Sequence, residues 1–91
     1  MTIYTFVAEF RGGTYISQIR ATDVNSAMIL WGKSLDLTQI KFLGDKGKIE
    51  LQVKLDNESP TEVREVENVW YFSLRIKPGF FMVNVIKTAE S

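Results

Sequence analysis

The fold is decided by residues 6–19, which read Phe6-Val7-Ala8-Glu9-Phe10-Arg11-Gly12-Gly13-Thr14-Tyr15-Ile16-Ser17-Gln18-Ile19. Two strand-like runs meet there at a Gly-Gly pair, and glycine accepts the positive φ angles that a tight hairpin turn requires. With these glycines as a two-residue turn, Phe10 pairs with Tyr15, and the aromatic side chains share one side of the hairpin. A slip of one residue would turn that aromatic row to solvent, so the sequence predicts a β-hairpin with one buried face.

A helix is predicted directly after this hairpin. Asp23, or Thr22 beside it, is a suitable N-cap, because a short side-chain oxygen can accept a hydrogen bond from an amide of the first turn. Apolar residues then recur at the spacing of one helical face, namely Val24, Ala27, Met28, Trp31 and Leu35. The helix is expected to end near Leu35, with Gly32 marking either an early end or a close approach to the sheet.

Further strands are predicted in the second half of the chain. Apolar and polar side chains alternate over residues 48–55, as in a strand with one wet face. Residues 36–43 could form a short strand before it, with residues 44–47 as a hairpin turn. Residues 70–77 and 80–86 alternate around Pro78-Gly79, which predicts a closing hairpin that pairs Ile76 with Phe81. Residues 56–67 are polar and are expected to form a mobile acidic loop.

These elements predict one small α+β domain over residues 1–91. Its antiparallel sheet would have about five strands, in the order strand, strand, helix, optional strand and three strands, with one helix packed on one face. The expected core combines Tyr4, Phe6, Phe10, Tyr15, Ile19, Ile49, Leu51, Val53, Trp70, Phe72, Leu74, Phe81, Val83 and Val85 with the helical Val24, Ala27, Met28 and Trp31.

The composition excludes several kinds of chemistry. The chain has no cysteine and no histidine, so it lacks thiolate nucleophiles and the commonest general base and metal ligand. The remaining acid–base candidates lie together in the polar loop, namely Asp56, Glu58, Glu62, Glu65 and Glu67. Nothing in the sequence indicates the apolar cleft that carboxylate catalysis needs. We expect no enzymatic activity, no cofactor and no metal site, and a carboxylate-dependent enzyme is the most distant alternative.

The sheet face opposite the expected core is more apolar than a solvent-exposed face normally is. The predicted interaction face comprises Val7, Ile16, Gln18, Arg20, Tyr71, Arg75 and Met82. Contiguous apolar patches usually mark contact surfaces, and Tyr, Met and Arg are enriched at interfaces. We therefore expect a protein-interaction module that self-associates or binds a separate protein through this face or a sheet edge. Two alternatives stay open: residues 37–43 cover the face, or its apolar side chains are only scattered.

The same face could instead bind single-stranded nucleic acid. Tyr71 and Phe80 would then stack on bases, while Arg20, Arg75 and Lys77 would bind phosphates. Eleven basic and eleven acidic residues give a net charge of zero, which argues against phosphate binding. The longest apolar runs, residues 27–31 and 69–72, are too short to span a bilayer, and the N-terminus lacks a signal-peptide pattern. A cytoplasmic protein without a membrane partner is therefore expected.

Overall fold

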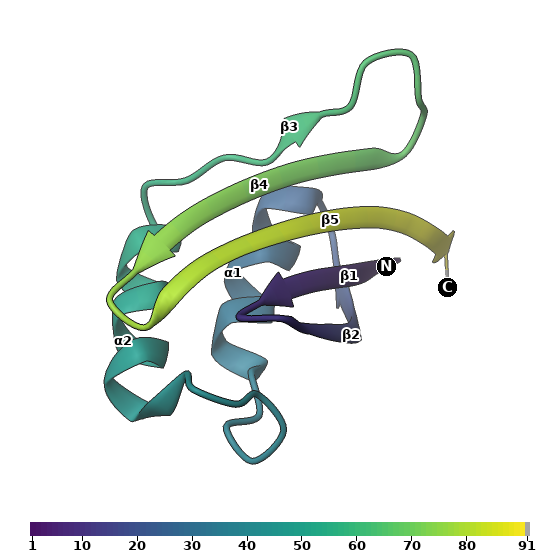
Figure 1. The fold of residues 1–91 in the computed structure, drawn as a ribbon. Coiled ribbons are helices and arrows are strands. Elements are labelled where there is room, and N and C mark those ends of the chain that lie inside the picture. The colour runs from purple at the N-terminus through teal and green to yellow at the C-terminus, as the bar shows by residue number, and fades with distance from the viewer. Residues whose placement is uncertain (91) are drawn as a thin grey trace.

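A computed structural model describes residues 1–90, and in it five antiparallel strands form one sheet with two helices on the same face (Figure 1). The elements are β1 (Thr2–Phe10), β2 (Gly13–Ala21), α1 (Val24–Ser34), α2 (Gly44–Leu55), β3 (Thr61–Glu62), β4 (Val69–Ile76) and β5 (Gly79–Glu90). The strands lie side by side in the order β2-β1-β5-β4-β3, so β5 is central. The predicted α+β class and antiparallel sheet are confirmed.

The core lies between the sheet and the two helices and is centred on Trp31 of α1. Its indole stacks on Phe6, with ring centroids 5.5 Å apart, and meets Phe72 and Phe81 edge-on at 5.6 and 5.9 Å. These four aromatic side chains come from α1, β1, β4 and β5. Their contacts therefore join the helix to both hairpins, and aromatic pairs add to the stabilisation that burial alone provides.

The first hairpin forms as predicted, but its turn lies one residue earlier. Arg11 (φ 49°) and Gly12 (φ 82°) occupy the two turn positions, and positive φ at both is the requirement of a type I′ turn. Phe10 therefore pairs with Gly13 and not with Tyr15. Moving the turn by one residue changes the pairing by two, so every side chain stays on its predicted face.

The closing hairpin departs from its predicted register in the same way. Its turn is formed by residues 77–78, so Ile76 pairs with Gly79 and not with Phe81. The two hairpin turns lie close together, and the Arg11 guanidinium in one donates a hydrogen bond of 3.0 Å to the carbonyl of Pro78 in the other. Here too the two-residue change preserves the faces of the strands.

Helix α1 begins at the predicted cap. The Asp23 carboxylate accepts hydrogen bonds from the Ser26 amide at 2.8 Å and from the Ser26 hydroxyl at 3.2 Å. These bonds satisfy an amide that the helix itself leaves without a partner, and they lower the pKa of Asp23 below its ordinary value of 3.8. The last helical residue is Ser34, one residue before the predicted end.

We expect Asp23→Ala to destabilise the protein in a pH-dependent way. A carboxyl whose folded pKa is depressed adds stability above its unfolded pKa, and this stability is lost as the pH falls through the folded value. Thermal unfolding should therefore show a lower melting temperature for Asp23→Ala at neutral pH, and a difference that shrinks below about pH 4. Asp23→Ser keeps a capping oxygen and is the control. An equal deficit for Asp23→Ala at pH 3 and pH 7 would contradict this role of the carboxylate.

The prediction of a strand over residues 48–55 is wrong, because α2 occupies Gly44–Leu55. Residues 44–47 accordingly form the first turn of that helix and not a hairpin turn. The buried residues of this region recur every four positions, as Leu43, Gly47, Leu51 and Leu55. Leu51 and Leu55 belong both to the alternating apolar pattern of a strand and to the four-residue spacing of a helical face. The sequence of this segment therefore fits a strand and a helix alike. Ile49 and Val53, which were expected in the core, are 62% and 59% exposed.

A close approach of the two helices holds α2 in place. A Cβ on Gly32 would collide with a terminal methyl group of Leu55, so any other residue at this position would require the Leu55 side chain to move. The Gln52 amide also donates a hydrogen bond of 3.2 Å to the Gly32 carbonyl. Gly32 thus permits close packing, as one of the two predictions stated, but against the second helix and not against the sheet.

Two connecting segments also differ from expectation. Residues 36–43 form turns and no strand, and they place Ile40 and Leu43 in the core. They therefore lie on the helical side of the sheet and do not cover its other face. Residues 56–67 are not entirely a loop, since Thr61 and Glu62 form β3 and pair with Tyr71 and Trp70 of β4. The short strand β3 thus replaces residues 48–55 as the fifth member of the sheet.

Candidate protein-interaction surface

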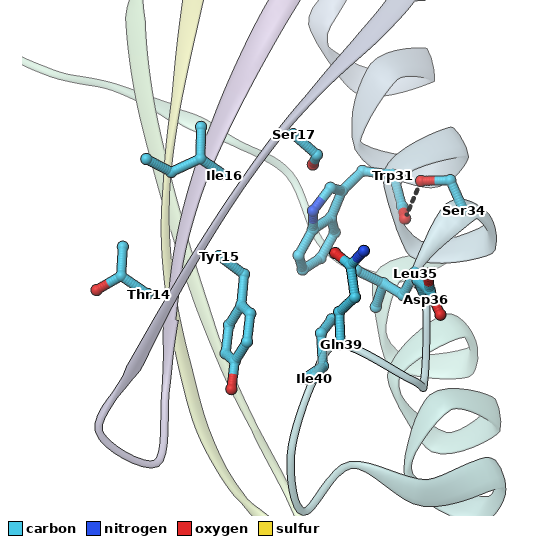
Figure 2. Close-up of a pocket in the computed structure, with 10 residues that line it drawn as sticks. All are labelled: Thr14, Tyr15, Ile16, Ser17, Trp31, Ser34, Leu35, Asp36, Gln39 and Ile40. Atoms are coloured by element: carbon cyan, nitrogen blue, oxygen red, sulfur yellow. Dashed lines mark hydrogen bonds between the residues drawn. The ribbon is translucent and has the colours of Figure 1, made fainter.

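The candidate surface is the face of the sheet that points away from α1 and α2, which we call the open face. Directly paired residues of antiparallel strands point to the same side of a sheet, so the register shows which residues share this face. One row crosses all five strands, through Ile16, Val7, Asn84, Tyr71 and Thr61. Among residues 1–90, both helices and the segment 36–43 lie on the opposite side, as Figures 1 and 2 show.

The structure places all seven predicted residues on the open face, although they do not all touch one another. Val7 and Ile16 are direct neighbours on β1 and β2, and Ile16 is 68% exposed. Tyr71 lies two strands away from Val7, with Asn84 between them. Met82 occupies the adjacent row on β5 and is 42% exposed. The open face thus presents apolar side chains that solvent can reach, with the polar Asn84 on the central strand between them.

Two arginines lie toward opposite ends of the open face. Arg75 pairs with Phe80, and its guanidinium lies 5.3 Å from the centre of that ring. Arg20 is at the other end, on β2, where it pairs with Ile3. Exposed aromatic, methionine and arginine side chains are residue types enriched at protein interfaces.

A chain of hydrogen bonds connects three strands of the open face. Gln18 on β2 donates from its amide nitrogen to the Thr5 hydroxyl at 3.1 Å. The hydroxyls of Thr5 and Thr88 share a bond of 2.9 Å, and Thr88 donates to the Ile3 carbonyl at 3.2 Å. Thr88 is the extra residue where the pairing of β1 and β5 shifts, which indicates a β-bulge. These bonds fix the orientation of Gln18, which is one of the predicted residues.

Sequence reasoning missed the contribution of β3 to this face. Thr61 joins the row that contains Tyr71, whereas the acidic composition of residues 56–67 predicts a loop. Only a few residues of the sequence indicate this strand. Thr61 and Val63 are β-branched, and they follow Pro60, a residue typical of strand starts and sheet edges.

The cavity shown in Figure 2 lies beside the outer edge of β2 and has a volume of about 240 Å³. Tyr15 and Ser17 point toward the helical side, whereas Thr14 and Ile16 point to the open face. The other lining residues are Trp31 and Ser34 of α1 and residues of the segment from Leu35 to Ile40. It therefore adjoins β2, and its lining is shared between the sheet and α1.

The one titratable carboxyl of this cavity is Asp36, and its environment favours the charged form. Asp36 accepts bonds from the Thr38 hydroxyl at 2.6 Å and the Thr38 amide at 2.9 Å, which lower the pKa of the carboxyl below 3.8. A carboxylate of lowered pKa is a weaker base than an ordinary aspartate. This cavity is therefore a recess of mixed polar and apolar lining beside a strand edge, and its carboxylate is poorly suited to proton transfer.

Over the described residues 1–90, no group of three or more acidic side chains is arranged to hold a metal ion. No helix within the same range is long and apolar enough to cross a membrane. Comparison with protein-family models, curated proteins and solved structures finds no significant match. Function is therefore inferred from the geometry of the open face alone.

Proposed function

We propose that this chain is a non-enzymatic protein-interaction module that binds a second copy of itself through the open face. The observation that carries this proposal is the exposure of apolar side chains on an uncovered sheet face. Ile16, Met82, Phe80 and Tyr71 are 68%, 42%, 38% and 37% exposed. Exposed apolar patches of this kind usually mark contact surfaces, and stacking two sheets would remove them from water.

The dimensions of the open face suit a dimer. Four long strands spaced about 4.8 Å apart, with about eight residues each at 3.3 Å, give a face of roughly 500 Å². Two such faces in contact would bury on the order of 1,000 Å², which is the lower limit for a specific interface. A partner that covered only part of the face would bury an area below that limit, so the partner must be about as wide as the open face.

The charge of the chain favours a second copy over a charged partner. The net charge is zero, so two copies do not repel each other as they approach. The open face itself carries both signs, with Glu9 on β1 and Arg75 on β4. A two-fold axis between stacked faces can bring such opposite charges together, and pairs at the border contribute more to specificity than to affinity.

We expect Tyr71→Ala/Arg75→Ala to weaken self-association about tenfold or more while leaving the fold intact, because tyrosine and arginine are enriched among the few residues that dominate interface energies. Light scattering after size exclusion, with absorbance at 260 and 280 nm, measures mass and bound nucleic acid together. The matched control is Ile49→Ala/Val53→Ala, which removes two exposed apolar side chains from α2, on the opposite side of the sheet. Far-UV circular dichroism reports whether each variant is folded.

Three results would contradict the proposal. The first is a monomeric wild-type chain at every concentration, and the second is an equal loss of assembly in the α2 control. The third is salt-sensitive absorbance at 260 nm that elutes with the protein, since phosphate contacts weaken steeply as salt rises whereas apolar contacts do not. That result would assign the open face to nucleic acid.

A further inference from the structure

The two edges of the sheet differ in how they are protected from pairing with another strand. The β3 edge is two residues long, follows Pro60 and contains Glu62, which are features that block strand addition. The β2 edge is nine residues long, has no proline and carries a single charge, Arg20. Among residues 1–90, no strand pairs with the outer side of β2. A long strand of this composition is a ready template for pairing.

The hairpin turn determines which backbone groups of β2 point outward. Phe10 and Gly13 flank the two-residue turn, so they form a hydrogen-bonded pair, and bonded pairs alternate along an antiparallel ladder. Gly13, Tyr15 and Ser17 therefore direct their amide and carbonyl groups toward β1. The intervening Thr14, Ile16 and Gln18 direct theirs away from the sheet.

We propose that the outer edge of β2 pairs in antiparallel fashion with β2 of a second copy, centred on Ser17. In this register Ser17 lies opposite Ser17 of the second copy, and Ile16 lies opposite Gln18. It is the register of greatest overlap, because Ser17 is the middle residue of Gly13–Ala21. Outward-pointing residues meet outward-pointing residues, so every pair around Ser17 can form its backbone bonds. This contact uses another surface than the open face and goes beyond the proposed function.

The side chains of β2 are compatible with this register. Arg20 would lie opposite Thr14 of the second copy, so like charges do not face each other across the strands. On the helical side Tyr15 would lie opposite Ile19, which brings that isoleucine to the mouth of the cavity of about 240 Å³ beside β2. Two sheets joined in this way would keep their helices on the same side, because the pairing preserves strand faces.

Helix α1 supplies a second apolar contact next to this edge. Ile29 and Lys33 line a cavity shared with α2, so that flank of α1 faces the other helix. Leu30 is on the opposite flank, one turn before Ser34, which lines the cavity beside β2. Leu30 is 43% exposed. Pairing of the β2 edges would turn the Leu30 side chains of the two copies toward each other and reduce that exposure.

The absence of cysteine in the sequence allows a direct test with single-cysteine variants. Residues opposite each other in a non-hydrogen-bonded antiparallel pair have Cα atoms about 4.5 Å apart, which a disulfide can bridge. Ser17→Cys is therefore expected to form a covalent dimer under mild oxidation, as measured on a non-reducing gel. Thr14→Cys is the matched control, since the two copies of residue 14 would lie about 20 Å apart in this register.

A proline substitution tests the backbone bonds separately. Gln18→Pro, made in the Ser17→Cys chain, removes one outward amide and no bond of the β1–β2 ladder, and proline is tolerated at sheet edges in this orientation. We expect the yield of covalent dimer to fall about tenfold, because each copy loses a bond across the edge. Gln18→Ala removes the same side chain but keeps the amide, and its yield is expected to stay high. Thr14→Pro is a second proline variant if Gln18→Pro loses its far-UV spectrum.

Two outcomes would overturn the edge pairing: cross-linking of Ser17→Cys no faster than that of Thr14→Cys, or equal yields for the proline variant and Gln18→Ala. The experiment is repeated in the Tyr71→Ala/Arg75→Ala chain, in which the open face is altered. Cross-linking there is expected to persist, because Tyr71 and Arg75 are on β4, three strands from β2. The cross-linking experiment therefore tests the pairing of the β2 edges even if the chain does not associate through the open face.

Discussion

Trp31→Ala is expected to produce the largest loss of stability, about 3–5 kcal/mol in the free energy of unfolding. Trp31 is 1% exposed and contacts aromatic rings from β1, β4 and β5, so its removal leaves a cavity bordered by rigid strands. Such walls collapse poorly, and the cost of a cavity grows with the volume that remains. Because a small domain is stable by about 5–15 kcal/mol in total, this loss is a large fraction of the whole.

Urea unfolding followed by far-UV circular dichroism measures this effect without relying on tryptophan fluorescence. The control is Trp70→Ala on β4, which is half-buried and contacts Tyr4 edge-on at 5.9 Å. Trp70→Ala is expected to lower the free energy of unfolding clearly less than Trp31→Ala does, because solvent can enter the space that Trp70 leaves. Equal costs for the two variants would contradict the central position of Trp31.

Leu51→Ala is expected to lower the free energy of unfolding by about 2–5 kcal/mol, whereas Ile49→Ala should lower it by less than about 0.5 kcal/mol. Leu51 is fully buried, and Ile49 is 62% exposed on another side of α2. In a strand these two residues, two positions apart, would point to the same face and have similar costs. The pair of variants therefore distinguishes the helix from the predicted strand.

Chemical denaturation of the two variants under identical conditions gives the comparison. Val53→Ala provides an independent check, since Val53 is 59% exposed and should behave like Ile49→Ala. Comparable destabilisation at positions 49, 51 and 53 would contradict the helical assignment of this segment.

The faces of the hairpin strands could be predicted from the sequence, but their registers could not. The alternation of apolar residues fixes which side chains share a face, and it is unchanged when pairing moves by two residues. The choice of turn was the uncertain step, because Gly12-Gly13 satisfies a two-residue turn as well as the observed Arg11-Gly12. The observed turn puts Gly13 in the strand, where the Tyr15 ring lies over it and leaves no space for a side chain.

Helix α2 could not be recognised because its sequence fits two periods. Alternating Ile49, Leu51 and Val53 resemble a strand, whereas Glu50, Gln52 and Lys54 are good helix formers. Tertiary packing favours the helix, because it buries Leu51 and Leu55 in the core and brings Leu55 against Gly32 of α1. That contact joins residues far apart in the sequence, and local patterns do not contain it.

The open face was accessible to prediction because it depends on strand alternation alone. All seven predicted residues lie on it, from Val7 on β1 to Met82 on β5, since the register errors preserved strand faces. The position of β2 at the edge of the sheet could not be predicted from the sequence. Which strand is at the edge depends on the order β2-β1-β5-β4-β3, and non-local pairing of β1 with β5 sets that order.

The most direct test of the central claim is light scattering of the purified chain over a wide range of concentrations. A self-associating module gives a mass above the 10.4 kDa of one chain, which falls on dilution and falls further in Tyr71→Ala/Arg75→Ala. The Ile49→Ala/Val53→Ala control is expected to match the wild type. A mass of 10.4 kDa for the wild-type chain at every concentration would contradict the account.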